Sequence, residues 1–212
     1  MRVRTFLTLA AGAALLSVAV TVMWYQDWRY SLPTPRPAGL EQPELGATPL
    51  LPGALGEVRH STSKPLFVRF FNPACPCSRF NLSHLRVLLK THGGRVEFIA
   101  VLEGETSADA LQQELASLGV SIPAIADSWG AIVGALGVYA TPEAAVLEAG
   151  GRLFYRGNYN RVRYYAIPSS EYARIALEAL LAGQPRPLYP DEAAVAWGCP
   201  LPHHSSPARM SV

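Results

Sequence analysis

The sequence predicts an α/β sandwich, with a mixed central sheet flanked by helices, preceded by one N-terminal transmembrane helix. Three observations predict it. Residues 66–71 form a β-branched and aromatic run, which two cysteines and an amphipathic run follow directly. Gly150–Gly151 separates two apolar runs, as in a β-hairpin. Residues 5–24 contain no charged side chain, and these 20 residues are about the length that crosses a bilayer.

Residues 1–25 are predicted to be an uncleaved membrane anchor. The alternative is a cleaved signal peptide, but the nearest small-x-small site, residues 17–19, lies inside the apolar run. Arg2 and Arg4 would hold the short N-terminal tail inside the cell, so both alternatives place the rest of the chain across the membrane. We expect a single-pass protein of the inner (plasma) membrane with its C-terminal domain in the periplasm, where disulfides persist. The aromatic residues typical of a membrane interface are Trp24, Tyr25, Trp28 and Tyr30.

The segment that follows, residues 26–57, is predicted to be a linker. Six prolines in residues 31–57 favour a stiff, extended spacer over a folded unit. The net charge of the whole chain is only +2, which gives no indication of a nucleic-acid partner.

The folded domain is predicted to span residues 58–185. Its first strand, residues 66–71, ends at the turn signal Asn72-Pro73, and an amphipathic helix follows the cysteines. That helix carries Phe80, Leu85, Leu88 and Leu89 at helical spacing and stops at Gly93–Gly94. A second strand over residues 96–102 completes a βαβ unit, which favours parallel pairing.

The second half of the folded domain is predicted to contain another helix, a short strand, a helix, a hairpin and a last helix. Caps are expected at Thr106 or Ser107, and at Asp127 or Ser128. The remaining predicted elements are a helix bearing Leu111, Leu115 and Leu118, an extended segment over 122–126, a helix through Leu136, a loop over 137–142, strands over 144–148 and 152–156, and a helix over 172–182 started by Ser169 or Ser170.

The chemistry is expected where the first strand meets the first helix of the domain. Cys75 and Cys77 stand there, with Pro76 between them. Unpaired N–H groups and the helix dipole favour a thiolate at a helix N-terminus, and the thiolate is the reactive species. The pattern therefore indicates thiol–disulfide chemistry. The alternative is a buried pair or an inert structural disulfide.

Residues 58–185 resemble the thioredoxin-fold proteins, and in pattern the membrane-anchored thioredoxin-like proteins of bacterial cytochrome c maturation and the redoxins. FVRFFNPACPCS resembles the segment of that family that leads from the strand into the active site. IPAIADSWGAIVGALGVYATPEAAVLEAGGRLFYRG resembles its second half. In the family, the proline of the Thr-Pro loop is cis and lies against the active-site cysteines. The resemblance implies this role for Pro142, with Thr141 before it.

The active-site motif departs from the family's Cys-x-x-Cys. The matching residues are Cys75-Pro76-Cys77-Ser78, so Cys75 aligns with the attacking cysteine and Ser78 stands where the resolving cysteine would be. We expect Cys75 at the N-cap and Pro76 at the first helical position. Cys75 is expected to be the more exposed and more acidic thiol.

Two candidates remain for the resolving cysteine. Cys77 is the first, although a bond between Cys75 and Cys77 would close a very small ring. Cys199 is the second, and the alternative for it is a tail cysteine without a partner. Residues 186–212 are read as a Pro-rich tail, expected to be disordered beyond Pro202.

The same residues suggest other functions. Cys75 and Cys77 suggest a copper chaperone resembling the Sco type, whose cysteines are spaced more widely and whose histidine comes later. His84 is expected on the helix surface, and His203–His204 is weak evidence for a metal. In the peroxiredoxins, which share the fold, a threonine stands three positions before the attacking cysteine, and the matching residue here is Asn72, which disfavours a peroxidase. A basic aromatic cluster suggests either an anionic partner or a charged sheet edge. It comprises Tyr155, Arg156, Tyr159, Arg161, Arg163, Tyr164 and Tyr165.

The sequence thus predicts a membrane-anchored thiol–disulfide oxidoreductase that acts on protein thiol and disulfide substrates through Cys75. Cys77 or Cys199 resolves the mixed disulfide, and Thr141 and Pro142 shape the substrate groove. No organic cofactor, metal or nucleic acid is implied, and the membrane is contacted through the N-terminal helix. The alternatives are the copper chaperone and a thioredoxin-fold binding module that lacks turnover.

Overall fold

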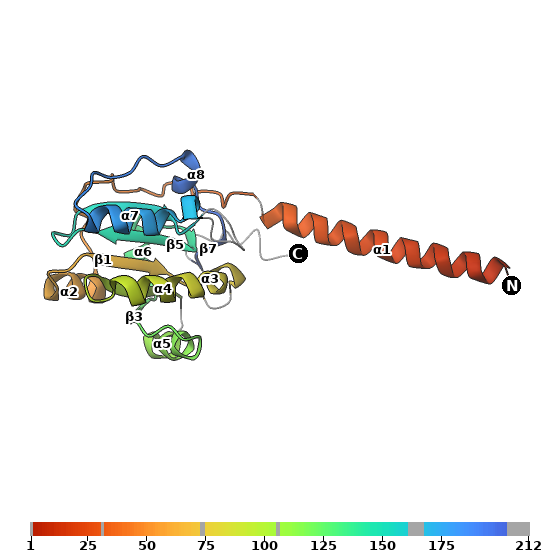
Figure 1. Cartoon of the computed structure of the whole chain (residues 1–212), viewed down its shortest axis with the longest axis horizontal. Coiled ribbons are helices and arrows are strands. Elements are labelled where there is room, and N and C mark those ends of the chain that lie inside the picture. Colours follow the sequence, from red (N-terminus) through yellow and green to blue (C-terminus); the bar gives the residue numbers. More distant parts are fainter. Residues whose placement is uncertain (1, 31, 73–74, 105–106, 161–167, 203–212) are drawn as a thin grey trace. The chain divides into compact units, whose positions relative to one another are not determined.

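The computed structural model describes residues 2–30, 32–72, 75–104, 107–160 and 168–202, and it divides into two units after Pro33. The first unit contains the helix α1 (Arg2–Tyr30), drawn in red in Figure 1. The stretch Val3–Trp28 is long and apolar enough to span a membrane, and none of it is buried within the protein. The rings of Tyr25 and Trp28 lie 6.1 Å apart near the end of this helix.

The second unit is built on a five-stranded sheet in the order β3-β2-β1-β5-β6. β1 pairs in parallel with β2, and β2 with β3, whereas β5 is antiparallel to both β1 and β6. The predicted mixed α/β sandwich is confirmed. The elements are α2 (Gly53–Ser61), β1 (Leu66–Phe70), α3 (Pro76–Phe80), α4 (Leu82–His92), β2 (Glu97–Glu103), α5 (Ala108–Ser117), β3 (Ala124–Asp127), α6 (Ala131–Leu136), β4 (Ala140–Thr141), β5 (Glu143–Leu147), β6 (Leu153–Asn158), η1 (Pro168–Ser170), α7 (Tyr172–Leu181), α8 (Asp191–Ala194) and β7 (Cys199–Pro200).

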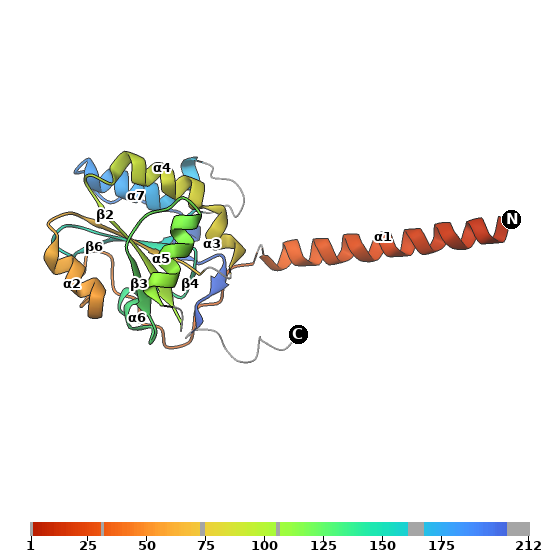
Figure 2. The same cartoon turned by 90° about the horizontal axis from the view of Figure 1, so that it is seen from below.

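The two faces of β1 belong to two separate cores, because successive side chains of a strand point to opposite faces. Phe67 packs in one core with residues of α4, α5 and α7. Leu66, Val68 and Phe70 pack in the other, with residues of α2 and α6. Figure 2 shows α4 and α7 on one side of the sheet and α2 and α6 on the other. Helices therefore cover both faces, which is why every residue of β1 is buried.

A side-chain cap fixes the start of α5 where the sequence predicts it, whereas α6 begins later than predicted, with Gly130 as its N-cap, although Asp127 still bonds to its first turn. The hydroxyl of Ser107 accepts a hydrogen bond from the N–H of Ala110 at the start of α5. One carboxylate oxygen of Asp127 accepts from the N–H groups of Ile132 and Val133, both at 2.9 Å, at the start of α6. Thr106, the alternative cap of α5, lies outside the described residues.

The single helix predicted after the cysteines is instead two, α3 and α4, which meet at Asn81. Asn81 has φ −94° and ψ 6°, outside the helical region. Its buried side chain accepts a hydrogen bond from the amide of Asn160 at 2.7 Å. The break turns Phe80 outward, so this predicted core residue is 47% exposed.

The predicted spacer over residues 26–57 differs from the structure, because the chain from Thr34 onward is part of the folded unit. Prolines remove only their own donors, and the other residues of the segment bond to the domain. The N–H of Gly46 donates to the carbonyl of Leu153 at 2.7 Å, and Gln42 donates to the carbonyl of Gly137 at 2.6 Å. Leu55, in α2, is fully buried, so the folded unit begins before residue 58.

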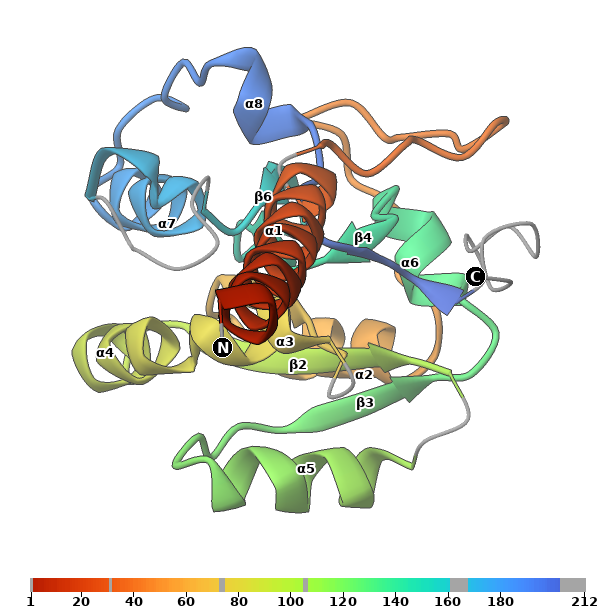
Figure 3. The same cartoon turned by 90° about the vertical axis from the view of Figure 1, so that its right-hand side faces the viewer.

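The region after Gln184 also packs on the domain up to Pro202. Ala196 and Leu201 are buried, and β7 pairs antiparallel with β4. Figure 3 shows β7 beside β4 near α6. Pairing with β4 gives this Pro-rich segment a fixed place that its composition did not indicate. The histidines of the tail and the residues beyond them lie outside the described part of the chain.

Candidate functional site

Cys75 lies at the N-cap of α3, as the sequence predicts. Its φ of −90° and ψ of 115° are extended, which is the conformation that a following proline favours. Pro76 occupies the first helical position, where its missing N–H costs nothing. The expected difference in exposure is absent, since Cys75 is 2% and Cys77 4% exposed.

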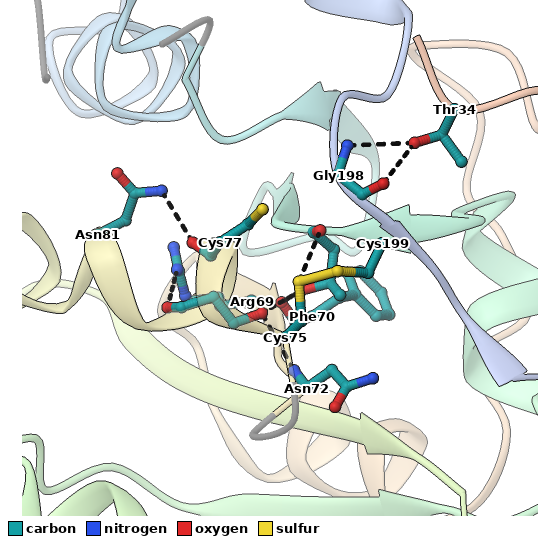
Figure 4. Close-up of a disulfide and its surroundings, with 11 residues drawn as sticks. Thr34, Arg69, Phe70, Asn72, Cys75, Cys77, Asn81, Gly198 and Cys199 are labelled. Atoms are coloured by element: carbon teal, nitrogen blue, oxygen red, sulfur yellow. Dashed lines mark hydrogen bonds between the residues drawn. A yellow bond between two sulfur atoms is a disulfide. The ribbon is translucent and has the colours of Figure 1, made fainter. Parts of the chain in front are cut away.

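Cys75 is joined to Cys199 by a disulfide that links residues 124 positions apart, with Cα atoms 6.3 Å apart. Figure 4 shows this bond between the start of α3 and β7. Cys77 is free and buried. The cysteine of the tail is therefore the bonded partner of Cys75, and the Cys75–Cys77 pair favoured from the sequence is not the one that is joined.

The strand β7 holds Cys199 in place through its backbone. Cys199 is the register partner of Thr141, and Pro200 of Ala140. The hydroxyl of Thr34 accepts from the N–H of Gly198 at 3.1 Å and donates to its carbonyl at 2.9 Å (Figure 4). These contacts fix the backbone on either side of the cysteine to the folded unit.

Gly198 allows the close approach of the tail to β4. A Cβ on this residue would lie 2.1 Å from the carbonyl oxygen of Thr141 and 3.1 Å from Cδ of Pro142. Backbone atoms cannot yield that much space, so position 198 accepts only glycine in this arrangement. The Gly-Cys pair of the tail is a signal in the sequence that could have indicated the contact.

The peptide bond between Thr141 and Pro142 is cis, as the resemblance implies. The sulfur of Cys75 lies 4.0 Å from the carbonyl oxygen of Thr141. The hydroxyl of Thr141 donates to the carbonyl of Phe70 at 3.1 Å and lies 2.5 Å from the hydroxyl of Ser78. Ser78 thus connects the cysteine helix to the cis-proline loop.

A buried carboxylate supports the same loop, and sequence reasoning missed it. Glu143 is 1% exposed, and one of its oxygens accepts from the N–H groups of Tyr139 and Ala140, at 3.0 and 2.9 Å. Burial raises the pKa of Glu143 to about 7, against the lowering effect of these two hydrogen bonds. Its only sequence signal was a charge at the start of an apolar strand.

Arg69 places a buried positive charge behind the cysteine helix. It is 1% exposed and donates to the carbonyl of Ser78 at 3.1 Å. Its guanidinium carbon lies 4.1 Å from the ring centre of Tyr159, a cation–π contact. Burial lowers the pKa of Arg69. In the sequence, the signal for a buried charge was this arginine inside the otherwise apolar run LFVRFF.

His84 is part of a polar chain and only 12% of its side chain is exposed, so it is not the solvent-facing residue of the helix surface that the sequence suggests. Its Nδ1 lies 2.7 Å from the hydroxyl of Tyr159, and its Nε2 lies 3.4 Å from a carboxylate oxygen of Glu171. Burial lowers the pKa of His84, while Glu171 opposes this effect. Glu171 also pairs with Arg174. His84 is not a member of the group formed by the three cysteines.

The basic aromatic cluster is only partly described. Arg156 donates to the carbonyl of Pro43 at 2.8 Å, and Tyr155 and Tyr159 are buried. Its other members, including Arg161 and Arg163, lie outside the described residues. The described members therefore support the packing of the domain.

The fold is a thioredoxin-like α/β sandwich. Two solved structures cover most of the chain at 21% identity. A hypothetical protein from Sinorhizobium meliloti 1021 has a TM-score of 0.60 and covers 76% of this chain and 95% of its own. An uncharacterized conserved protein from Geobacillus kaustophilus has a TM-score of 0.62, with coverage of 83% and 99%. A candidate thiol:disulfide interchange protein DsbE from Chlorobium tepidum is 16% identical, with a TM-score of 0.50 and coverage of 68% and 99%.

One protein family matches the sequence directly. The family described as Domain of unknown function (DUF6436) matches residues 51–199, so the chain belongs to it. The match ends at Cys199 and therefore includes all three cysteines. No curated protein matches the chain.

Proposed function

We propose that this protein is a thiol–disulfide oxidoreductase anchored in the inner membrane, with its folded unit in the periplasm, and that Cys75 and Cys199 form its redox couple. The observation that carries the proposal is the disulfide between the N-cap cysteine of α3 and the cysteine opposite Thr141, beside Pro142. A thiolate at a helix N-cap is favoured by the unpaired N–H groups of the first turn.

The exchange proceeds in two steps. The thiolate of Cys75 attacks a substrate disulfide, forming a mixed disulfide and releasing one substrate sulfur as a thiolate, which takes a proton. The thiolate of Cys199 then attacks the sulfur of Cys75. The Cys75–Cys199 bond forms and the second substrate sulfur leaves, so that the substrate gains two electrons and the protein loses them. The reverse sequence oxidises a substrate dithiol.

The substrate segment would bind where β7 now lies. β4 offers two residues to an antiparallel partner, and β7 is the partner bonded to them. An extended peptide that replaces the tail would pair with Ala140 and Thr141 by β-augmentation. Its cysteine would then lie next to Cys75, and β7 must pair with β4 again before Cys199 can attack in the second step.

The proposal is tested by trapping mixed disulfides in cells with single cysteine variants of the full chain. Cys199→Ser should accumulate proteins linked through Cys75, because the second step is blocked. Cys75→Ser should trap none. Trapping by Cys77→Ser but not by Cys199→Ser would assign the resolving role to Cys77, and no trapping by either variant would favour a binding module without turnover.

The orientation rests on the two arginines before the uncharged run and on the aromatic residues after it. A reporter enzyme that is active only in the periplasm, fused after residue 30, should be active. Activity of a cytoplasmic reporter at the same position would reverse the topology.

A further inference from the structure

Three sulfur atoms meet at the site, although the redox couple uses only two. The Sγ atoms of Cys75, Cys77 and Cys199 all lie within 4.8 Å of one another. Cys75 and Cys77 come from the start of α3, and Cys199 comes from β7 (Figure 4). Cys75 and Cys77 are buried. Cys77 has no part in the proposed exchange, yet its sulfur lies within 4.8 Å of both sulfurs of the couple.

We propose that the reduced protein binds one Cu(I) ion through the thiolates of Cys75, Cys77 and Cys199. Sulfurs held about 2.3 Å from one metal ion lie about 4 Å apart, so the three need only small shifts to share an ion once the disulfide is open. Soft thiolate ligands select Cu(I) or zinc. The cluster of described residues contains three cysteines and no carboxylate or imidazole, which leaves the four-ligand zinc site incomplete.

The site is held in place independently of the disulfide. The backbone of Gly198 bonds to Thr34, and the N–H of Leu201 donates to the carbonyl of Tyr139 at 2.9 Å. These contacts flank Cys199 on both sides. They keep its sulfur near the other two after reduction, so the ion meets a site that is largely formed.

The charge of the site is also partly offset. Cu(I) and three thiolates carry a net charge of −2, which is costly to bury alone. Arg69 brings a buried guanidinium to the same turn, bonding the carbonyl of Ser78. Its Nε and Nη1 have no hydrogen-bond partner among the described residues. The arginine therefore supplies a positive charge behind the sulfurs.

Metal binding and the disulfide exclude each other. Opening the bond between Cys75 and Cys199 takes two electrons and two protons, which dithiothreitol supplies as it closes to its cyclic disulfide. Each thiol then releases its proton as Cu(I) binds. The redox state of the pair thus decides whether the copper site exists, and Cys77 gains a role that the exchange reaction does not give it.

The test uses the full chain in detergent, reduced with dithiothreitol and freed of it without oxygen. Cu(I) is titrated against the chromophoric chelator bicinchoninate. The reduced protein should withdraw one Cu(I) per chain, the oxidised protein none, and X-ray absorption should report three sulfur neighbours. A two-sulfur site, or equal binding by the oxidised protein, would overturn the proposal.

Variants locate the ligands. Substituting a residue that only hydrogen-bonds a metal ligand weakens metal binding by up to about a hundredfold, and removing a ligand itself costs at least as much affinity. Cys77→Ser should therefore weaken Cu(I) binding by at least about a hundredfold. Formation of the Cys75–Cys199 disulfide in this variant reports that it folds. The matched control replaces both tail histidines, His203→Ala with His204→Ala, and should keep the native affinity. Unchanged binding by Cys77→Ser, or lost binding by the histidine variant, would refute the three-thiolate site.

Discussion

The hydroxyl oxygens of Ser78 and Thr141 lie 2.5 Å apart and join the first turns of α3 to the residue before the cis-proline. Because Thr141 donates its own hydrogen to Phe70, Ser78 is the donor in this pair. The position that holds the resolving cysteine in the family's motif here holds a group that fixes the geometry of the site.

Ser78→Ala should lower the free energy of unfolding by about 1–3 kcal/mol, because the buried hydroxyl of Thr141 loses the hydrogen bond that it accepts. Denaturant titration of the full chain in detergent measures the change. The control is Ser83→Ala on the exposed face of α4, expected within about 0.5 kcal/mol of the native protein. Equal effects of the two substitutions would contradict the role of the hydroxyl pair.

Glu143 should make stability fall with rising pH. Its pKa is raised to about 7 in the folded protein, so the folded state holds the proton more tightly than the unfolded state. This stabilisation is complete below pH of about 4.5 and is lost as the pH rises through about 7. The difference is about 3 kcal/mol by the linkage relation. Unfolding free energies of the native protein and Glu143→Gln, compared from pH 4.5 to 8, should diverge by this amount, whereas parallel curves would exclude the titration.

Gly198→Ala should weaken the redox couple without touching a sulfur atom. The added Cβ meets the carbonyl of Thr141 at 2.1 Å, so β7 must shift away from β4. Overpacking that costs the disulfide-bonded state about 1–3 kcal/mol corresponds to a loss of about 5- to 150-fold in the equilibrium constant for the Cys75–Cys199 bond. Thiol quantification in dithiothreitol redox buffers measures it.

The matched control for that variant is Gly134→Ala on α6, where a Cβ meets no atom within 4 Å. It should leave the redox equilibrium unchanged and stabilise the helix by up to about 1 kcal/mol. If both alanines shift the redox equilibrium equally, the close approach at position 198 is not the cause.

Alkylation should identify the bonded pair. When the oxidised protein is unfolded without reductant and alkylated, Cys77 should take the label, and peptide mass mapping should link Cys75 to Cys199. A label on Cys199 instead would indicate a bond between Cys75 and Cys77. Reduction before unfolding is the control, and it should label all three cysteines.

The sequence predicts the sheet, most helices and the position of Cys75 because these depend on local signals. A β-branched run fixes β1, and a proline after Cys75 fixes the N-cap. The cis bond before Pro142 was accessible only through the family resemblance, since no local signal distinguishes it from other prolines.

The rest of the site depends on contacts between distant segments. No periodicity in the sequence connects Cys199 to Cys75 across 124 residues. The Pro-rich composition of residues 31–57 and 186–212 indicates extended chain, but it does not indicate where on the domain that chain lies. Arg69 and Glu143 were visible as charges in apolar runs. Their partners, Ser78 and the N–H groups of Tyr139 and Ala140, could be named only from the folded chain.

The sequence separation of the disulfide gives the site an order of assembly. A chain made from its N-terminus presents Cys75 and Cys77 long before Cys199, and the couple can close only after the sheet and β7 have formed around it. Closing a ring of more than 100 residues removes entropy worth about 5 kcal/mol from the unfolded chain. The Cys75–Cys199 bond of the proposed redox couple therefore also reports that folding is complete. A chain that still lacks β7 cannot form it.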